Sequence, residues 1–101
     1  MKNEKIMHEL KKIIDPELGI SIVDLGLIRK IDMLNDGFVN IEMTLTSPGC
    51  PIGPELMQAV NYFAGKVEGV RNVEVKLVFS PPWNPELDAT QDGKFQLSML
   101  R

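Results

Sequence analysis

The feature that most constrains the fold is an alternating segment preceded by a tight turn. Between residues 39 and 46 apolar and polar side chains alternate, and the apolar set is Val39, Ile41, Met43 and Leu45. This period of two predicts a β-strand with one buried face. The preceding Asn35-Asp36-Gly37 is a strong hairpin signal, because Asp-Gly accepts the positive φ values of a tight turn. A strand predicted over residues 27–34 therefore pairs antiparallel with residues 39–46.

Two helices and a third strand complete the pattern. Apolar residues at helical spacing predict a helix over residues 4–14, ended by Asp15-Pro16, because proline disfavours the helical conformation of the residue before it. A second helix is predicted over residues 56–67, and renewed alternation predicts a strand over residues 73–79. The order α-β-β-α-β predicts an α/β two-layer sandwich, in which helices cover one face of a small mixed sheet.

Two segments are less regular. Residues 17–26 contain two glycines, and we interpret them as a structured loop. The tail, residues 86–101, has a pattern that fits one short helix, but Gly93 weakens that prediction, because glycine is a poor helix former.

Length and composition bound the class of protein. The 101 residues, with 44% apolar and 25% charged side chains, fit one globular domain spanning residues 1–101. No apolar stretch is long enough to cross a bilayer, and the N-terminus lacks the apolar core of a signal peptide. A net charge of −3 disfavours nucleic-acid partners. The lone cysteine fits a reducing compartment, so we expect a cytoplasmic protein without membrane partners.

The predicted topology brings three irregular segments together. One of these segments, 15–24, precedes the first strand, and the others, 47–54 and 80–85, follow the second and third strands. All three are expected at the end of the sheet away from the tight turn. They contain the only cysteine, Cys50, and the only tryptophan, Trp83. Loops gathered at one end of a rigid scaffold are common sites of function.

Cys50 is the principal candidate for chemistry. It precedes the second helix by a few residues, where unpaired backbone N–H groups favour a thiolate; the alternative is a buried, inert thiol. With one cysteine and the solvent-facing His8, the chain cannot complete a zinc or cluster site by itself. A cluster would need a symmetric dimer that supplies two thiolates, or ligands from a partner or a small thiol. A Cys–His enzyme is disfavoured, because His8 is the only candidate base.

The other candidates have structural alternatives. Asp15, Glu17 and Asp24 could supply oxygen ligands or acid–base groups. Asp15 could equally accept hydrogen bonds from loop amides as a turn former, and a structural role is favoured for both Asp15 and Asp24. The role of Glu17 stays open. Trp83, between prolines, is either an exposed docking residue or a cap on the end of the core.

Four motifs in order resemble the metal–sulfur cluster biosynthesis domain family, which includes the SufT-like and PaaD-like proteins. They are Asp15-Pro16-Glu17-Leu18-Gly19, Val23-Asp24-Leu25-Gly26-Leu27-Ile28, Met43-Thr44-Leu45-Thr46 leading to Gly49-Cys50-Pro51, and Pro81-Pro82-Trp83-Asn84-Pro85. The resemblance spans residues 6–87 and implies an iron–sulfur-assembly-like fold. It also implies that Cys50 is the reactive residue, with Asp15 and Glu17 as the family's acid pair and Asp24, Thr46 and Trp83 in supporting positions.

The resemblance suggests two functions of different kinds. The first is a non-catalytic maturation factor that inserts or transfers iron–sulfur clusters, with Cys50 as a transient ligand and with client apoproteins and other assembly factors as partners. The second is an interaction module, such as an accessory subunit of a phenylacetyl-CoA oxygenase system, in which Cys50 never binds metal. PaaD-like subunits usually carry further cysteines in a C-terminal extension, and this sequence has none there.

Overall fold

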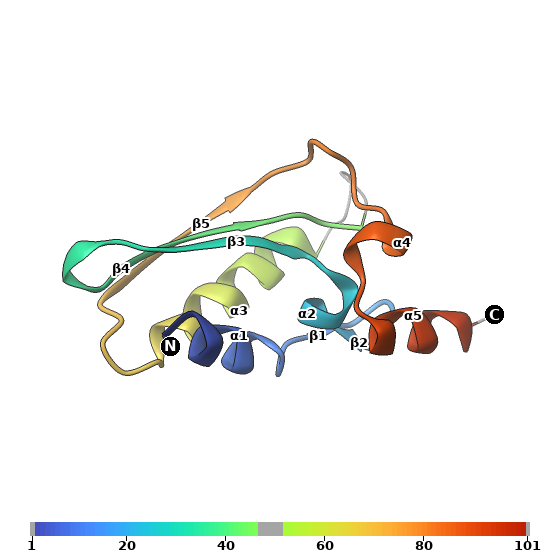
Figure 1. The fold of residues 1–101 in the computed structure, drawn as a ribbon, viewed down its shortest axis with the longest axis horizontal. Helices are drawn as coiled ribbons and strands as arrows, with labels where there is room; N and C mark the ends of the chain where they lie inside the picture. The colour runs from blue at the N-terminus through green and yellow to red at the C-terminus, as the bar shows by residue number, and fades with distance from the viewer. Residues whose placement is uncertain (1, 47–51, 101) are drawn as a thin grey trace.

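The computed structural model describes residues 2–46 and 52–100. Its elements, in chain order, are α1 (Lys2–Leu10), β1 (Ile14–Asp15), β2 (Ile20–Ser21), α2 (Ile22–Leu25), β3 (Ile28–Met33), the 3₁₀ turn η1 (Asn35–Gly37), β4 (Phe38–Met43), α3 (Gly53–Gly65), β5 (Asn72–Leu77), α4 (Pro85–Asp88) and α5 (Gln91–Ser98). Helices lie below the main sheet and a second group of short elements lies at one end (Figure 1). None of the helices in the described ranges is long and apolar enough to span a membrane.

The main sheet has the strand order β3-β4-β5, so β4 is central. β3 and β4 pair antiparallel with Ile31 opposite Ile41, and β4 and β5 pair parallel with Ile41 opposite Val75. The predicted tight turn is confirmed, with positive φ values at Asp36 and Gly37. A bulge between Ile28 and Lys30 interrupts the regular register of β3.

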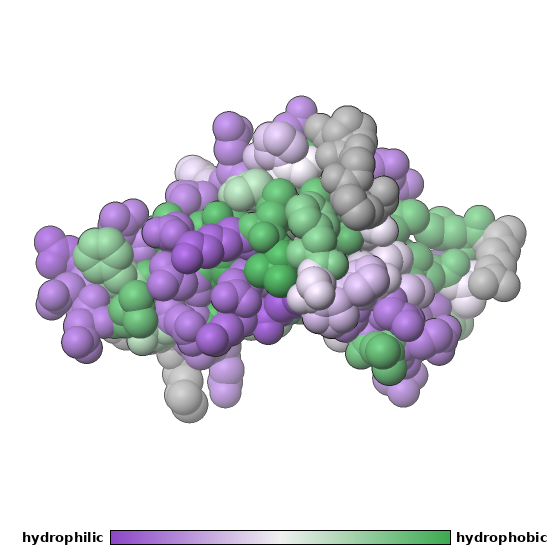
Figure 2. All heavy atoms as spheres, turned by 90° about the horizontal axis from the view of Figure 1, so that it is seen from above, coloured by the Kyte–Doolittle hydropathy of each residue, from purple (hydrophilic) through white to green (hydrophobic). Residues whose placement is uncertain are grey.

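The core lies between this sheet and the helices α1 and α3. Its buried members from the predicted strand face are Val39, Ile41, Met43 and Leu45, and those from α1 and α3 are Ile6, Leu10, Leu56, Val60 and Ala64. The opposite face of the sheet carries no helix (Figure 1), and hydrophilic side chains dominate it toward the β3–β4 turn (Figure 2). The predicted two-layer sandwich is therefore confirmed.

Some predicted boundaries were wrong. The first helix ends at Leu10 rather than at residue 14, because Ile14 and Asp15 pair with Ser21 and Ile20 as a small two-stranded sheet. Residues 17–26, interpreted as a loop, include β2 and the short helix α2. The Ser21 side chain accepts a hydrogen bond from Val23 N and caps α2, and Gly26 ends it with φ 79°.

The tail is more ordered than its sequence indicated. It forms α4 and α5, and Gly93 lies inside α5. A Cβ atom at Gly93 would overlap the backbone carbonyl of Asp24, so glycine is required there for the close approach of α5 to α2. The requirement comes from Asp24, 69 positions earlier in the sequence, and helix propensity, which is a local property, therefore does not predict it.

Candidate functional site

At the end of the sheet away from η1, the structure joins the chain before β3 to the described residues that follow β4 and β5, and residues 47–51 of the predicted loops lie outside the described residues. Thr44 N donates to Leu27 O at 2.8 Å, joining the segment after β4 to the segment before β3. Trp83 Nε1 donates to Leu25 O at 2.7 Å, joining the proline-rich segment after β5 to α2. Figure 1 shows α2, α4 and α5 grouped at this end. We call this group of elements, together with Thr46 and Ile52, the loop end.

Cys50 lies outside the described residues, so its proposed role stays a prediction. Its nearest described neighbours in the sequence are Thr46, which is half-buried, and Ile52, which is the N-terminal cap residue of α3. Ile52 O accepts the first helical hydrogen bond from Leu56 N at 2.9 Å. Cys50 therefore precedes the start of a thirteen-residue helix by three positions.

Asp15 is a buried turn former. The residue is only 2% exposed. Its Oδ1 atom accepts hydrogen bonds from Glu17 N at 2.8 Å and from Leu18 N at 3.2 Å. Its backbone carbonyl accepts from Gly19 N at 2.7 Å. These contacts fix the turn that Asp15, Pro16 and Glu17 form, and Glu17 is exposed to solvent there.

Asp24 connects α2 to the C-terminal helix. Its Oδ1 accepts a hydrogen bond from Thr90 Oγ1 at 2.9 Å, and its backbone carbonyl accepts from Thr90 N at 2.8 Å. Thr90 Oγ1 also accepts from Gly93 N at 3.0 Å and so caps α5. The buried carboxylate of Asp24 thus orients the start of α5.

Trp83 lies partly buried against the hydrophobic core. The hydrogen bond from its indole N–H to Leu25 O satisfies the one polar atom of the side chain. Trp83 therefore covers the end of the core at the loop end, which is the second of the two readings that the sequence left open.

Two residues of the loop end were not singled out from the sequence. Thr44 is fully buried, and its Oγ1 has no hydrogen-bond partner among the described residues. Arg29 lies at the bulge of β3, and its Nη2 is 3.7 Å from Asp88 Oδ2. Neither was detectable by alternation, because Thr44 occupies a position on the polar face of its strand and the bulge breaks the alternation at Arg29.

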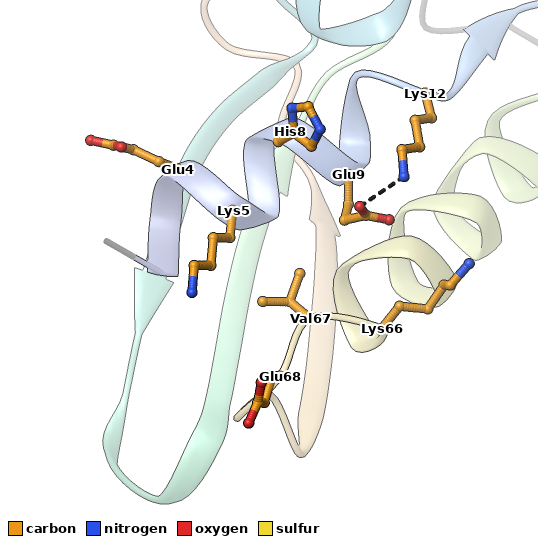
Figure 3. A pocket seen from close by; sticks show the side chains of 8 residues that line it. All are labelled: Glu4, Lys5, His8, Glu9, Lys12, Lys66, Val67 and Glu68. Carbon is orange, nitrogen blue, oxygen red and sulfur yellow. Dashed lines mark hydrogen bonds and ion pairs between the residues drawn. The ribbon is translucent and has the colours of Figure 1, made fainter.

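A separate hollow of about 660 Å³ lies between α1 and the chain that follows α3. Side chains of both charges line it, together with the exposed His8 (Figure 3). The Lys12 Nζ–Glu9 Oε2 hydrogen bond, 2.8 Å long, lowers the pKa of Glu9. The described residues contain no group of three His, Cys, Asp or Glu side chains that could hold a metal ion. The described side chains that line this hollow therefore offer no metal site.

Comparison with known proteins gives a consistent picture. The model of a family described as iron–sulfur cluster assembly protein matches residues 3–77. The chain is 45% identical over 80 residues to the Fe-S protein maturation auxiliary factor YitW of Bacillus subtilis, which covers 79% of this chain and 78% of that protein. It is 43% identical over 75 residues to the Fe-S protein maturation auxiliary factor SufT of Staphylococcus aureus, covering 74% and 85% of the two chains.

Solved structures agree with the fold. A crystal structure of a domain of unknown function, DUF59, from Bacillus anthracis superimposes with a TM-score of 0.90 at 33% identity, over 97% of this chain and 92% of that chain. A conserved hypothetical protein from Thermotoga maritima superimposes with a TM-score of 0.78 at 38% identity, over 92% and 90%. The similarity includes the tail that follows the family match.

Proposed function

This chain belongs to the iron–sulfur cluster assembly protein family, and we propose that it serves iron–sulfur protein maturation as a transient, non-catalytic cluster carrier with Cys50 as its ligand. The descriptions of YitW and SufT as maturation auxiliary factors support the role. The observation that carries the choice of Cys50 is its position three residues before the start of α3. The unpaired amides of a helix N-terminus favour an anion, which increases the reactive thiolate fraction.

The loop end supplies a rigid frame for this segment. Before the segment that contains Cys50, the chain after β4 is held by the Thr44 N–Leu27 O hydrogen bond. After that segment, Ile52 caps the start of α3. Trp83 covers the adjoining end of the core through its bond to Leu25 O. A reactive group on a short segment between fixed elements can be presented to a partner with little loss of conformational freedom.

The count of protein ligands favours transfer over storage. Iron–sulfur clusters are usually held by four cysteines, and this chain has one cysteine and one histidine. The carboxylates of Asp15 and Asp24 already accept hydrogen bonds from the protein itself. The remaining ligands must come from outside the chain, either from a client apoprotein, from another assembly factor or from a small thiol. A reducing cytoplasm keeps the single thiol available.

An interaction module is the second candidate, and the surface of the tail favours it. Leu87 of α4 is 82% exposed, Phe95 of α5 is 66% exposed, and Met99, the residue after α5, is 68% exposed. Exposed apolar side chains on neighbouring elements are a feature of protein-binding surfaces. In this function the loop end and the tail bind a client or an oxygenase subunit, and Cys50 contributes no metal ligand.

Anaerobic reconstitution with iron, sulfide and a small thiol, which supplies the ligands that the chain lacks, separates the two functions. We expect the wild-type protein to bind iron and sulfide with visible absorbance, Cys50→Ala to lose both, and His8→Ala, the matched control at the other potential ligand, to keep both. Circular dichroism checks that each variant is folded. Equal iron in wild type and Cys50→Ala, or none in either, would overturn the carrier proposal. Maturation of client enzymes in cells that carry Cys50→Ala would then support the interaction module.

A further inference from the structure

The outer edge of β5 is a strand edge available for pairing. β5 is the last strand in the order β3-β4-β5. Val78 N donates to Met43 O at 2.8 Å, so the even-numbered residues of β5 direct their backbone groups to β4. The backbone groups of Val73, Val75 and Leu77 consequently face outward, because they alternate along a strand. Asn61 Nδ2 of α3 donates to Val73 O at 3.0 Å, which agrees with an outward-facing carbonyl, and the second lone pair of this carbonyl can still accept a hydrogen bond from an added strand.

The sequence of this edge is complementary to itself. Glu74 and Lys76 lie on the helix-free face of the sheet, and their side chains are 64% and 62% exposed. The Lys76 Nζ and Glu74 Oε1 atoms are 3.5 Å apart. If two β5 strands pair antiparallel about a two-fold axis at Val75, Glu74 lies opposite the partner's Lys76 and Lys76 opposite the partner's Glu74. On the other face, Val73 lies opposite the partner's Leu77. Opposite charges and apolar side chains at directly opposed positions stabilise an antiparallel pair.

The surface beside this edge has room for a second strand. A groove of about 370 Å³ runs along it, lined by Val75 and by four residues of α3, namely Met57, Gln58, Asn61 and Tyr62. Side chains of an added strand on the helix side would enter this groove. We propose that two copies of the chain associate through β5, with the two sheets continuing into one six-stranded sheet.

The other edge of the sheet is protected against the same association. β3 also carries an alternating ion pair, Lys30 and Asp32, 3.4 Å apart. However, the bulge at Arg29 distorts its register. Bulges are a usual means by which proteins block edge pairing. β5 has an uninterrupted six-residue register and no bulge.

The dimer is independent of cluster binding. Antiparallel pairing directs the C-terminal ends of the two β5 strands in opposite directions, and the loop end lies at the C-terminal end of β5. The two loop ends therefore lie at opposite ends of the six-stranded sheet. The dimer uses β5, which lies outside the loop end, so a protein that stays monomeric would leave the carrier proposal intact.

Charge reversal at the edge tests the dimer. Sedimentation velocity over a concentration series should show a monomer–dimer equilibrium for the wild type. Glu74→Lys and Lys76→Glu each place like charges at both symmetric positions, and each should raise the dissociation constant about tenfold or more. An equimolar mixture of the two variants restores both attractive pairs and should form a heterodimer, and the double exchange Glu74→Lys with Lys76→Glu should restore the homodimer.

Asp32→Lys on β3 is the matched control, and it should leave the dissociation constant unchanged. Both sites are exposed, and circular dichroism verifies the fold of each variant. A wild type that stays monomeric at millimolar concentration would overturn the proposal. So would single variants, or their mixture, that dimerise as the wild type does. Loss of association in Asp32→Lys alone would transfer the interface to β3 and equally refute pairing through β5.

Discussion

Replacing Gly93 with alanine should weaken the attachment of the C-terminal helix to the domain. An added Cβ would overlap the carbonyl of Asp24, which is backbone and cannot rotate away. α5 must therefore move outward from α2. That movement lengthens the Thr90 N–Asp24 O and Thr90 Oγ1–Asp24 Oδ1 hydrogen bonds, which are 2.8 and 2.9 Å long in the native structure.

The expected magnitude follows from the balance of these terms. A neutral hydrogen bond contributes about 1 kcal/mol and one to a carboxylate about 1.5–3 kcal/mol. Alanine regains about 1 kcal/mol, because it favours helix more than glycine does. The net loss in the free energy of unfolding is about 2 kcal/mol, and for a domain of this size it lowers Tm by roughly 10 °C.

Urea denaturation of Gly93→Ala beside Gly65→Ala measures the effect. Gly65 ends α3 with no atom within 4 Å of an added Cβ, so the control has the helix gain without the overlap. We expect Gly65→Ala to be neutral or more stable by up to about 1 kcal/mol. If Gly93→Ala matched that control, the close packing of α5 on α2 would be refuted.

Two further measurements test other contacts. Trp83→Phe removes the donor to Leu25 O and should lower the free energy of unfolding by about 1–2 kcal/mol, measured by urea denaturation; an unchanged midpoint would show that the indole bond contributes nothing. Lys12→Met should raise the Glu9 pKa toward its ordinary value, measured by NMR titration. Because the folded Glu9 pKa is lowered, the small stabilisation from this pair is present above the unfolded pKa and is lost as pH falls through the folded pKa. A titration midpoint that does not move would refute the assigned cause.

The main sheet could be predicted from the sequence because its signals are local. Alternation set the buried face of β4, and the Asp36-Gly37 turn set the antiparallel pairing with β3. The parallel pairing of β5 with β4 followed from the helix between them, which returns the chain to the other end of the sheet before β5 begins. Each of these inferences uses residues within one element or its adjoining turn, where the physical cause and the structural effect are close in the sequence.

The elements at the loop end could not be predicted in the same way. α2 is only four residues long and depends on its Ser21 cap and on packing against α5. Gly93 lowers the helix propensity of α5, yet its missing side chain is what permits the contact with Asp24. The early end of α1 depends on pairing between β1 and β2. In each case a tertiary contact decides against the local preference.

The same contacts bear on what the loop end can do with a metal cluster. Asp15 and Asp24, two buried carboxylates that were possible oxygen ligands but were predicted to have structural roles, each accept hydrogen bonds from the protein, and these bonds hold a turn and a helix in place. Recruiting either carboxylate to iron would break those bonds and leave buried donors without partners, which costs free energy. A permanent metal site that uses either of these two carboxylates is therefore disfavoured. The proposed carrier instead uses a single thiol ligand, completed by groups from another molecule, and a cluster held in this way can leave.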